Sequence, residues 1–430
     1  MKYIFKFTLL LFLVFFINET KANTLQDSLN SAYLNNSKLN AERANMRASK
    51  QEKNESVSEF LPSVTVSGYI SEQENSNPGE GNDTNFQPSE QSMVVEQKLF
   101  QGFSGVANFK KKKHGENIGK FSLKKVEQEV LLAAAESHAD LILSKKKVNI
   151  NLINVDLLER QVENDTNRLE KGEINLTDLA QSEASFEGAR AKLISAQNDL
   201  VTSKANFEKV IGKKPSDSIN EVIKYNLNLP GSLAVAYNIS KSENPDLQIA
   251  LLEFEQSKLD VIIAGADLSP SATISYKVAE QDDFSSTITE RTQQTVTATA
   301  TWSLFAGGSN YFNLKKEKER KNQSELLLQD TQKTVETEVA SAWSNYVSSK
   351  SMLDSIKSQV KAAEIANEGI TLEYESGGNS RTTLEVIQSR TILLNSRIDL
   401  ATSERNFLIS QFKLLSSIGR LTGNQLNLKN

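Results

Sequence analysis

The chain contains no cysteine, two histidines and only seven prolines among its 430 residues. The absence of cysteine excludes disulfide frameworks, cysteine-ligated zinc and thiol catalysis. His114 and His138 leave little for a metal site or a Ser-His-Asp arrangement, and the net charge of −5 carries no polyanion-binding signature. The sequence lacks a Gly-rich phosphate-binding loop, and its carboxylates are scattered rather than clustered. We therefore expect no catalytic residue, no cofactor, no metal and no nucleic-acid partner.

The positions of the few prolines leave two very long stretches uninterrupted, one between residues 89 and 214 and one after residue 270. Proline breaks helix interiors, and both stretches are rich in Ala, Leu, Lys, Glu, Gln and Ser. We therefore expect both stretches to be largely helical. Pro62 and Pro270 stand at equivalent points of two similar segments, which is the first indication of a duplication.

The chain repeats itself over almost its whole length. Residues 61–67 resemble residues 269–275, which lie 208 positions later, and 99–102 resemble 304–307, which lie 205 positions later. A single unit that has been doubled explains such matches. We expect a first repeat over 23–211, a connector over 212–243, a second repeat over 244–418 and a C-terminal tail over 419–430.

Each repeat has the same predicted order of elements. A first helix (24–60 or the shorter 244–268) is followed by a β-hairpin (63–101 or 271–304), a helix of roughly 70 residues, a Gly-marked turn and a last helix of roughly 35 residues. Large side chains recur every seven residues in the last helices, opposite small ones such as Ser182, Ala189, Ala196, Ser389, Ser396, Ser403 and Ser410. Large-against-small heptads are typical of helices that pack closely as coiled coils.

The predicted strands have one apolar and one small polar face. Residues 295–304 alternate hydroxyl and apolar side chains, and Val64, Val66 and Ile70 alternate with polar positions. Strands of this kind fit a transmembrane barrel with lipid outside and water inside, although a one-sided antiparallel sheet in water gives the same period. Four strands cannot close a barrel, because open edges cannot face lipid. Closure would require several chains, and three copies would give twelve strands while two would give eight.

The N-terminus is predicted to be a targeting segment. Lys2 and Lys6 flank a short basic region, and residues 7–17 form an apolar run that is too short for a membrane-spanning helix. We expect residues 1–22 to be a signal peptide, so that the mature protein is exported.

In its duplication, its heptads and its paired strands, the mature chain resembles the TolC-type outer-membrane efflux proteins. The most specific match extends from Gly172 to Gly212 and includes the segment Leu176–Glu183. The second copy carries the corresponding positions Tyr374, Gly377, Arg381, Thr382, Glu385, Val386, Ile418 and Gly419.

The resemblance implies a mixed α and β fold shared by a homotrimer. Four strands from each chain would form one transmembrane β-barrel in the outer membrane, and the coiled-coil helices would form an α-barrel in the periplasm. The implied function is a passive exit duct of an efflux or type I secretion system, not an enzyme. Its implied partners are a periplasmic adaptor (membrane fusion) protein, an inner-membrane transporter and outer-membrane lipid.

The resemblance also implies a closable entrance at the two helix turns. Carried over by position, Thr177 and Asp178 would face Tyr374 and Arg381, and Glu385 would form a ring of carboxylates. The next ring position, which is acidic in well-known members, is Gln388 in this chain.

Simpler roles exist for some of these residues, and a different function exists for the chain. Asp178 and Glu385 open helices, where a carboxylate gains about 0.3–1 kcal/mol from the helix dipole, and Thr177 is a candidate cap. The alternative function is an exported coiled-coil structural protein or a periplasmic adaptor. That alternative explains the heptads but leaves the four matched amphipathic strands unexplained.

Overall fold

The structure is a computed structural model that describes residues 24–75, 84–216, 227–285, 288–376 and 381–428. The predicted signal peptide over 1–22, Gly377 and part of the predicted connector lie outside these ranges. The chain divides into two compact units. The hairpin unit comprises Met1–Glu42, Lys124–Asn244 and Thr334–Asn430, and the strand unit comprises Arg43–Leu123 and Pro245–Lys333. Within the described ranges, no helix is long and apolar enough to cross a membrane.

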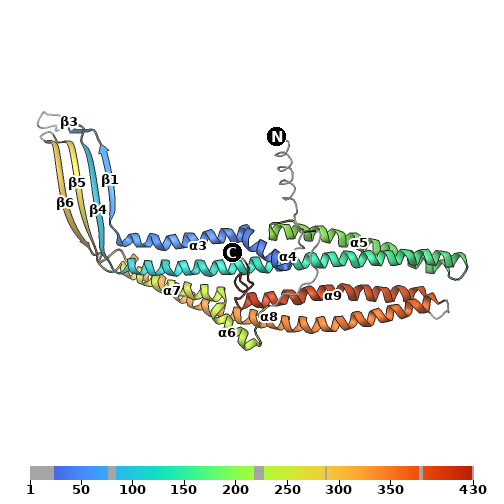
Figure 1. Ribbon diagram of the computed structural model, residues 1–430. Helices are drawn as coiled ribbons and strands as arrows, with labels where there is room; N and C mark the ends of the chain where they lie inside the picture. The colour runs from blue at the N-terminus through green and yellow to red at the C-terminus, as the bar shows by residue number, and fades with distance from the viewer. Residues whose placement is uncertain (1–23, 76–83, 217–226, 286–287, 377–380, 429–430) are drawn as a thin grey trace, which may run out of the picture. The chain divides into compact units, whose positions relative to one another are not determined.

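Two long helical hairpins make up most of the hairpin unit, and the long helix of each begins in the strand unit (Figure 1). Helix α4 (Ser104–Glu170) is followed by α5 (Leu176–Ile211), and α8 (Ser309–Glu375) is followed by α9 (Thr383–Ser417). Both long helices contain 67 residues, and the last helices contain 36 and 35, which confirms the predicted lengths. These lengths are possible because no proline interrupts the helices.

The small heptad positions form the seam of each hairpin. Buried residues of α5 include Ser182, Ala189 and Ala196, and those of α9 include Ser389 and Ser396. Small side chains at a helix–helix contact let the backbones approach closely, while the larger heptad residues fill the flanks. Hydroxyl groups also pair across the seams, as between Ser349 and Ser410, whose oxygens lie 2.8 Å apart.

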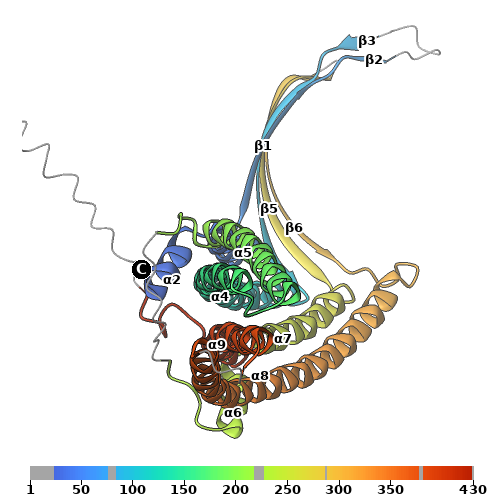
Figure 2. The ribbon, with the colours of Figure 1, turned by 90° about the vertical axis from the view of Figure 1, so that its right-hand side faces the viewer.

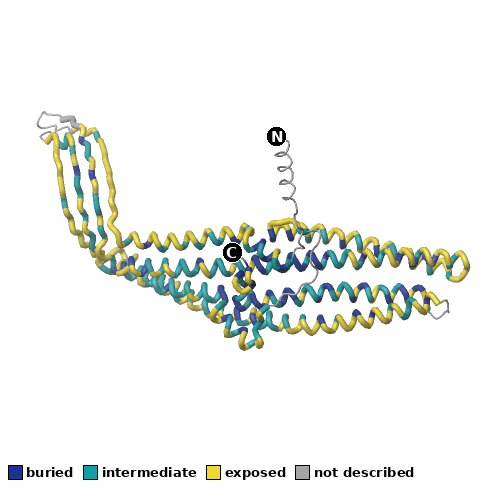
Figure 3. Tube along the Cα trace, viewed as in Figure 1, coloured by how far each residue is buried: buried dark blue, intermediate teal, exposed yellow. Residues whose placement is uncertain are grey.

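A buried core lies where the shorter helices meet the two hairpins (Figure 3). Its largest fully buried side chains include Leu29, Leu131, Phe207, Phe412 and Leu415. His138 is fully buried among them, and its Nδ1 lies 2.9 Å from the hydroxyl of Ser28. This core packs the shorter helices of the hairpin unit against one end of the helical hairpins.

The first helix of each repeat is broken by an asparagine. Helix α2 (Leu25–Asn35) ends at Asn36 before α3 (Ser37–Glu55) and the 3₁₀ turn η2 (Ser56–Phe60). Likewise, α6 (Leu233–Glu243) ends at Asn244 before α7 (Pro245–Ala266). The sequence predicts an unbroken helix over 24–60 and a connector over 212–243, which includes 233–243. Asn36 and Asn244 each take an extended backbone conformation with ψ of 123°, which ends the helix before them. The break at Asn244 agrees with the predicted helix start at 244, whereas the break at Asn36 and helix α6 differ from the prediction.

The strand unit contains one four-stranded antiparallel sheet in the order β1–β4–β5–β6 (Figure 1), and Figure 2 shows the same strands turned by 90°. Its strands are β1 (Ser63–Ile70), β4 (Ser89–Gln101), β5 (Ser271–Ser285) and β6 (Ile288–Thr301), which confirms both predicted β-hairpins. A small hairpin of β2 (Gln73–Asn75) and β3 (Thr84–Phe86) extends the first one and was not predicted. In the described part of the chain, β1 and β6 each pair on one side only.

The strand register sorts the side chains of the sheet into two faces. The apolar face contains cross-strand rows such as Val64–Val95–Tyr276–Val296. The neighbouring row, Thr65–Val94–Lys277–Thr295, points to the other face, because successive side chains of a strand alternate. On that polar face the Nζ of Lys277 lies 2.6 Å from a carboxylate oxygen of Glu90. The predicted alternation is therefore present in the folded sheet.

Glycine is required where the first β-hairpin leads into a long helix. Gly102 has a φ of 60°, and a Cβ at this position would lie 2.9 Å from atoms of Ala266. Gly307 takes almost the same backbone conformation in the second repeat, with a φ of 61°. The matched Leu-Phe-x-Gly segments therefore form matched strand-to-helix turns.

Candidate entrance site at the helix turns

The first helix turn joins α4 to α5 and is closed by a capping box. Gly172 takes the left-handed conformation with a φ of 73°, and Asn175 is the N-cap of α5. The Asn175 side chain accepts a hydrogen bond from the backbone N–H of Asp178, and the Asp178 carboxylate accepts one from the backbone N–H of Asn175. The capping role expected of Thr177 was therefore wrong, because Thr177 already lies inside the helix and is exposed. Asp178 does open the helix, as predicted.

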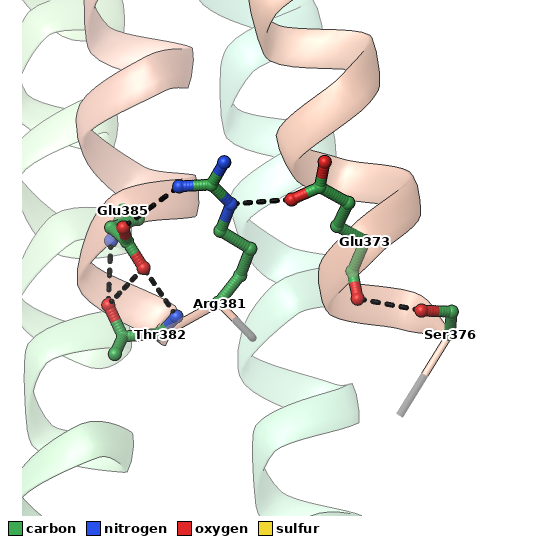
Figure 4. Close-up of polar contacts among 5 residues, drawn as sticks. All are labelled: Glu373, Ser376, Arg381, Thr382 and Glu385. Atoms are coloured by element: carbon green, nitrogen blue, oxygen red, sulfur yellow. Dashed lines mark hydrogen bonds and ion pairs between the residues drawn. The ribbon is translucent and has the colours of Figure 1, made fainter. Parts of the chain in front are cut away.

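The second helix turn carries a compact ionic group (Figure 4). Thr382 is the N-cap of α9 and forms a capping box with Glu385. The Arg381 guanidinium donates from Nε to Glu373 at 2.6 Å and from Nη1 to Glu385 at 3.2 Å. Arg381 thus links the last turn of α8 to the first turn of α9.

Hydrogen bonding shifts the proton affinities of this ionic group. The backbone N–H and hydroxyl of Thr382, together with Arg381, hold the pKa of Glu385 below its usual value. The two carboxylates, with Glu373 contributing most, raise the pKa of Arg381. Both shifts favour the charged forms of Glu385 and Arg381.

Tyr374 lies near the end of α8 and turns inward. Its side chain is 6% exposed, and its hydroxyl donates to Oδ1 of Asp165 at 2.8 Å. The same hydroxyl lies 3.0 Å from Oγ1 of Thr383, and the guanidinium carbon of Arg168 lies 4.6 Å from the ring centroid. Burial, with a further contribution from Asp165, raises the pKa of the Tyr374 phenol, so the hydroxyl remains a donor.

Asp165 of α4 is the centre of a buried polar cluster. Its side chain has no solvent exposure and accepts hydrogen bonds from Gln161, Ser182 and Tyr374. With Thr383, these residues form what we call the Asp165 cluster: Gln161, Asp165, Ser182, Tyr374 and Thr383. The cluster draws on α4, α5, α8 and α9 together.

Asp165 is not among the site residues predicted from the sequence. One buried stripe of α4 contains Ser137, Ser144, Asn151, Leu158 and Asp165, each seven residues after the previous one. An aspartate that continues such a stripe is a detectable signal, because a buried carboxylate requires hydrogen-bond partners.

The predicted entrance residues therefore fall into separate groups within one chain. Tyr374 bonds to Asp165, and Arg381 bonds to Glu373 and Glu385, so in this chain neither takes Thr177 or Asp178 as its partner. Gln388 is exposed on α9, one turn beyond Glu385. Contacts between these residues in neighbouring chains stay a prediction.

A polar groove of about 580 Å³ runs beside the Asp165 cluster. Its lining includes the basic residues Arg160, Arg168, Lys171 and Arg390 and the acidic residues Glu173 and Glu375. Arg390 of α9 donates to the backbone oxygen of Leu157 of α4 at 3.3 Å, and burial lowers its pKa. The described residues contain no group of three or more His, Cys, Asp or Glu side chains arranged to hold a metal ion.

The sequence of the chain matches the model of the outer membrane efflux protein family over residues 28–213 and 236–420. The chain belongs to this family. Members of the family are outer-membrane efflux channels, and the helix turns described above are therefore part of a channel-family protein.

Individual relatives agree with this assignment. The outer membrane efflux protein BepC of Brucella suis is 25% identical over 95% of this chain and 88% of its own length. The outer membrane protein TolC of Escherichia coli is 21% identical over 96% of this chain and 85% of its own length. The chain is thus similar to these proteins from end to end.

The fold matches solved structures of channel proteins at low sequence identity. The outer membrane channel CmeC of Campylobacter jejuni superimposes with a TM-score of 0.83 at 14% identity, over 93% of this chain and 86% of its own. The mostly helical chain with its small antiparallel sheet therefore has the fold of such channels.

Proposed function

We propose that the chain is the outer-membrane exit duct of a multicomponent efflux or type I secretion system. In this proposal three copies form a closed ring, in which twelve strands make a transmembrane β-barrel and the helices make an α-barrel in the periplasm. The duct is a passive conduit and not an enzyme, it needs no cofactor, and its energy comes from an inner-membrane transporter that a periplasmic adaptor links to it.

The observation that carries this proposal is the two-faced sheet with two unpaired edges. The apolar rows extend from Ala272 to Val278 of β5, which is roughly 20 Å at 3.3 Å per residue. An apolar band of about 25 Å is typical of outer-membrane barrels. Since β1 and β6 each pair on one side within the described chain, further strands are needed before this sheet can face lipid.

We further propose that the chain is organised as two repeats, over 23–211 and 244–418, after a signal peptide over 1–22. The turn residues Thr177, Asp178, Tyr374, Arg381, Glu385 and Gln388 then lie around the periplasmic entrance. In the assembled ring, Arg381→Ala or Asp178→Ala should raise basal conductance, because each removes a polar contact at the tips. Unchanged conductance in both variants would contradict this gate assignment while leaving the channel proposal intact.

The test of channel function is incorporation of the purified full chain into planar lipid bilayers. We expect discrete current steps of uniform size, because a closed barrel forms a pore of fixed dimensions. A preparation that is folded but produces no steps would contradict the proposal and favour the alternative, an exported coiled-coil structural or adaptor protein.

A further inference from the structure

In both repeats, a pair of lysines stands eight and eleven positions after the glycine of the strand-to-helix turn. We call these residues the four junction lysines: Lys110 and Lys113 of α4, and Lys315 and Lys318 of α8. All four are exposed, and none of them forms an ion pair within the described ranges. The neighbouring Lys111 and Lys112, by contrast, pair with Asp260 and Glu52. The same uncompensated positive charge therefore occurs at the same place in both repeats.

The two lysine pairs follow strands that end at the same edge of the sheet (Figure 1). Strands β4 and β6 both pair antiparallel with β5, and their last residues, Gln101 and Thr301, both lie opposite Ser271. The two strands therefore end about 10 Å apart, since neighbouring strands are about 4.8 Å apart. At about 1.5 Å per residue, Lys110 and Lys315 lie about 9 Å beyond the first residue of their helices. Helical side chains lean toward the helix N-terminus, so these lysines lean back toward the sheet.

Apolar and aromatic side chains are exposed between the sheet and the junction lysines in both repeats. They are Leu99 and Phe100 in the first repeat, and Trp302, Leu304 and Phe305 in the second. Residues 97–115 and 291–316 contain no acidic residue. An apolar strand face, then aromatic residues, then basic residues is the order that fits a membrane interface, where aromatic rings lie at the level of the head groups and lysines attract anionic lipids.

We propose that the four junction lysines bind the phosphate groups of anionic phospholipids at the membrane surface nearest the helices. This inference rests on the proposed channel function, in which the apolar face of the sheet contacts lipid. Two lysines three positions apart on a helix are neighbours and repel each other. A phosphate that accepts hydrogen bonds from both ammonium groups replaces this repulsion by attraction, and each lysine stem can pack along the exposed apolar side chains.

Other basic residues on the same helices show what an ordinary solvated helix face looks like in this protein. Lys120 of α4 pairs with Glu116, and Arg320 of α8 pairs with Glu317, each within about one turn of the same helix. The junction lysines lie closer to the sheet, where neither helix has an acidic residue in its first turn. Carboxylates in that position would repel lipid phosphate, so their absence fits an anionic membrane surface better than a water-exposed helix face.

The test measures which lipid surrounds Trp302 in the purified full chain after reconstitution into vesicles. Trp302 follows β6 directly and is 60% exposed, and Trp343 is the other tryptophan of the chain. Trp343→Phe therefore leaves Trp302 as the single emitter. The vesicles contain equal amounts of phosphatidylglycerol and phosphatidylcholine, and in separate samples one or the other lipid carries bromine on its acyl chains. Bromine quenches tryptophan fluorescence on contact, so the two samples give the ratio of the two lipids beside Trp302.

We expect phosphatidylglycerol to be preferred beside Trp302 about fivefold, which is the equilibrium ratio that one lysine near an anionic surface supplies. The preference should weaken between about 0.1 M and about 1 M KCl, because the Debye length falls from about 10 Å to about 3 Å. Replacing all four junction lysines by glutamine should bring the ratio to about one, and replacing them by arginine should preserve it.

A matched control removes the same charge from the hairpin unit. It combines four substitutions of exposed lysines that form no ion pair within the described residues: Lys204→Gln, Lys209→Gln, Lys350→Gln and Lys361→Gln. This variant should keep the fivefold preference, because the lysines of the strand unit are unchanged.

Equal quenching by the two brominated lipids in the Trp343→Phe chain would overturn the proposal. So would the same preference in the glutamine variant of the junction lysines as in the control. Trp302 fluorescence that neither brominated lipid quenches would show that the sheet does not enter the bilayer. That result would contradict the proposed channel function and, with it, the lipid site, so the two failures are distinguishable.

Discussion

At the scale of single residues, we expect substitutions to be most destabilising at glycines that need a left-handed backbone and at buried titratable side chains. Gly419 has a φ of 82°, and a Cβ there would overlap the backbone of Glu243. Gly172 has a similar φ of 73° but no neighbouring atoms within contact distance of a Cβ. Substituting Gly172 therefore measures the free-energy cost of the left-handed backbone alone, and substituting Gly419 measures that cost together with the cost of a steric clash.

Gly419→Ala should lower the free energy of unfolding considerably more than Gly172→Ala. We expect about 1 kcal/mol for Gly172→Ala, because only the left-handed conformation is penalised. Gly419→Ala adds a backbone clash that nearby atoms cannot relieve, and we expect more than about 2 kcal/mol. Thermal unfolding of the two variants measures the difference. Equal melting temperatures would show that the Glu243 contact is not tight.

His138 is the second residue with a predictable effect, and the effect depends on pH. Burial lowers its pKa from 6.5 to about 4, and the charge of Asp27 opposes the shift only partly. The unfolded chain therefore binds a proton between pH 6.5 and 4 that the folded chain does not bind. As the pH falls through this window the folded state loses roughly 3 kcal/mol, and above pH 6.5 the contribution is fully present.

The measurement is the melting temperature as a function of pH. It should fall between pH 6.5 and 4 in the unmodified chain and in His114→Gln, and it should fall less in His138→Gln. The same slope in His138→Gln as in the unmodified chain would show that other groups cause the acid sensitivity.

At the scale of elements, the asparagine breaks fix where the first helices of the two repeats end. The Oδ1 of Asn36 accepts hydrogen bonds from the backbone N–H groups of Lys38 and Leu39, and its Nδ2 donates to the carbonyl oxygen of Val210. Asn244 makes the equivalent donation to Ser417 at 2.9 Å. Each asparagine thus ties a helix break to the end of the last helix of its repeat.

Asn36→Ala should lower the free energy of unfolding by about 1–2 kcal/mol, because it removes both the cap and the tie to Val210. Asn36→Asp keeps the capping oxygen and loses only the donor, so its cost should be smaller. Chemical denaturation of the two variants measures the difference. An Asp variant that is as unstable as the Ala variant would show that the tie to Val210 matters more than the cap.

Most of the helices and strands could be predicted from the sequence, but some breaks and contacts between them could not. The 67-residue helices and the four long strands were predictable, because proline-free heptads and two-residue alternation are strong periodic signals. The start of a helix at residue 244 was also predicted, and α7 begins at Pro245. The break at Asn36 was not predictable, because a helix continues or stops there according to partners such as Val210 that lie far away in the sequence. The Asp165–Tyr374 bond was missed for the same reason, since it joins residues 209 positions apart.

At the scale of the whole molecule, the two faces of the sheet give opposite predictions for the same substitution. Val66 lies on the apolar face and is 76% exposed in the single chain, and Ser67 is its neighbour on the polar face. If the sheet faces lipid, Val66→Lys places a charge in hydrocarbon, which costs about 2–4 kcal/mol near the midplane. Ser67→Lys places the same charge in the water-filled interior.

We therefore expect Val66→Lys to reduce the amount of protein recovered from the outer membrane and Ser67→Lys to leave it nearly unchanged. Quantitative immunoblotting of fractionated membranes measures both. Equal recovery of the two variants would indicate that the apolar face does not contact lipid.

The mass of the assembly in mild detergent, measured by light scattering on protein extracted from outer membranes, tests the central claim most directly. The account predicts a protein mass three times that of the mature chain, as the closed twelve-stranded ring requires. A monomer or dimer recovered without detergent would contradict it, because four or eight strands without lipid would leave the apolar face of the sheet in water.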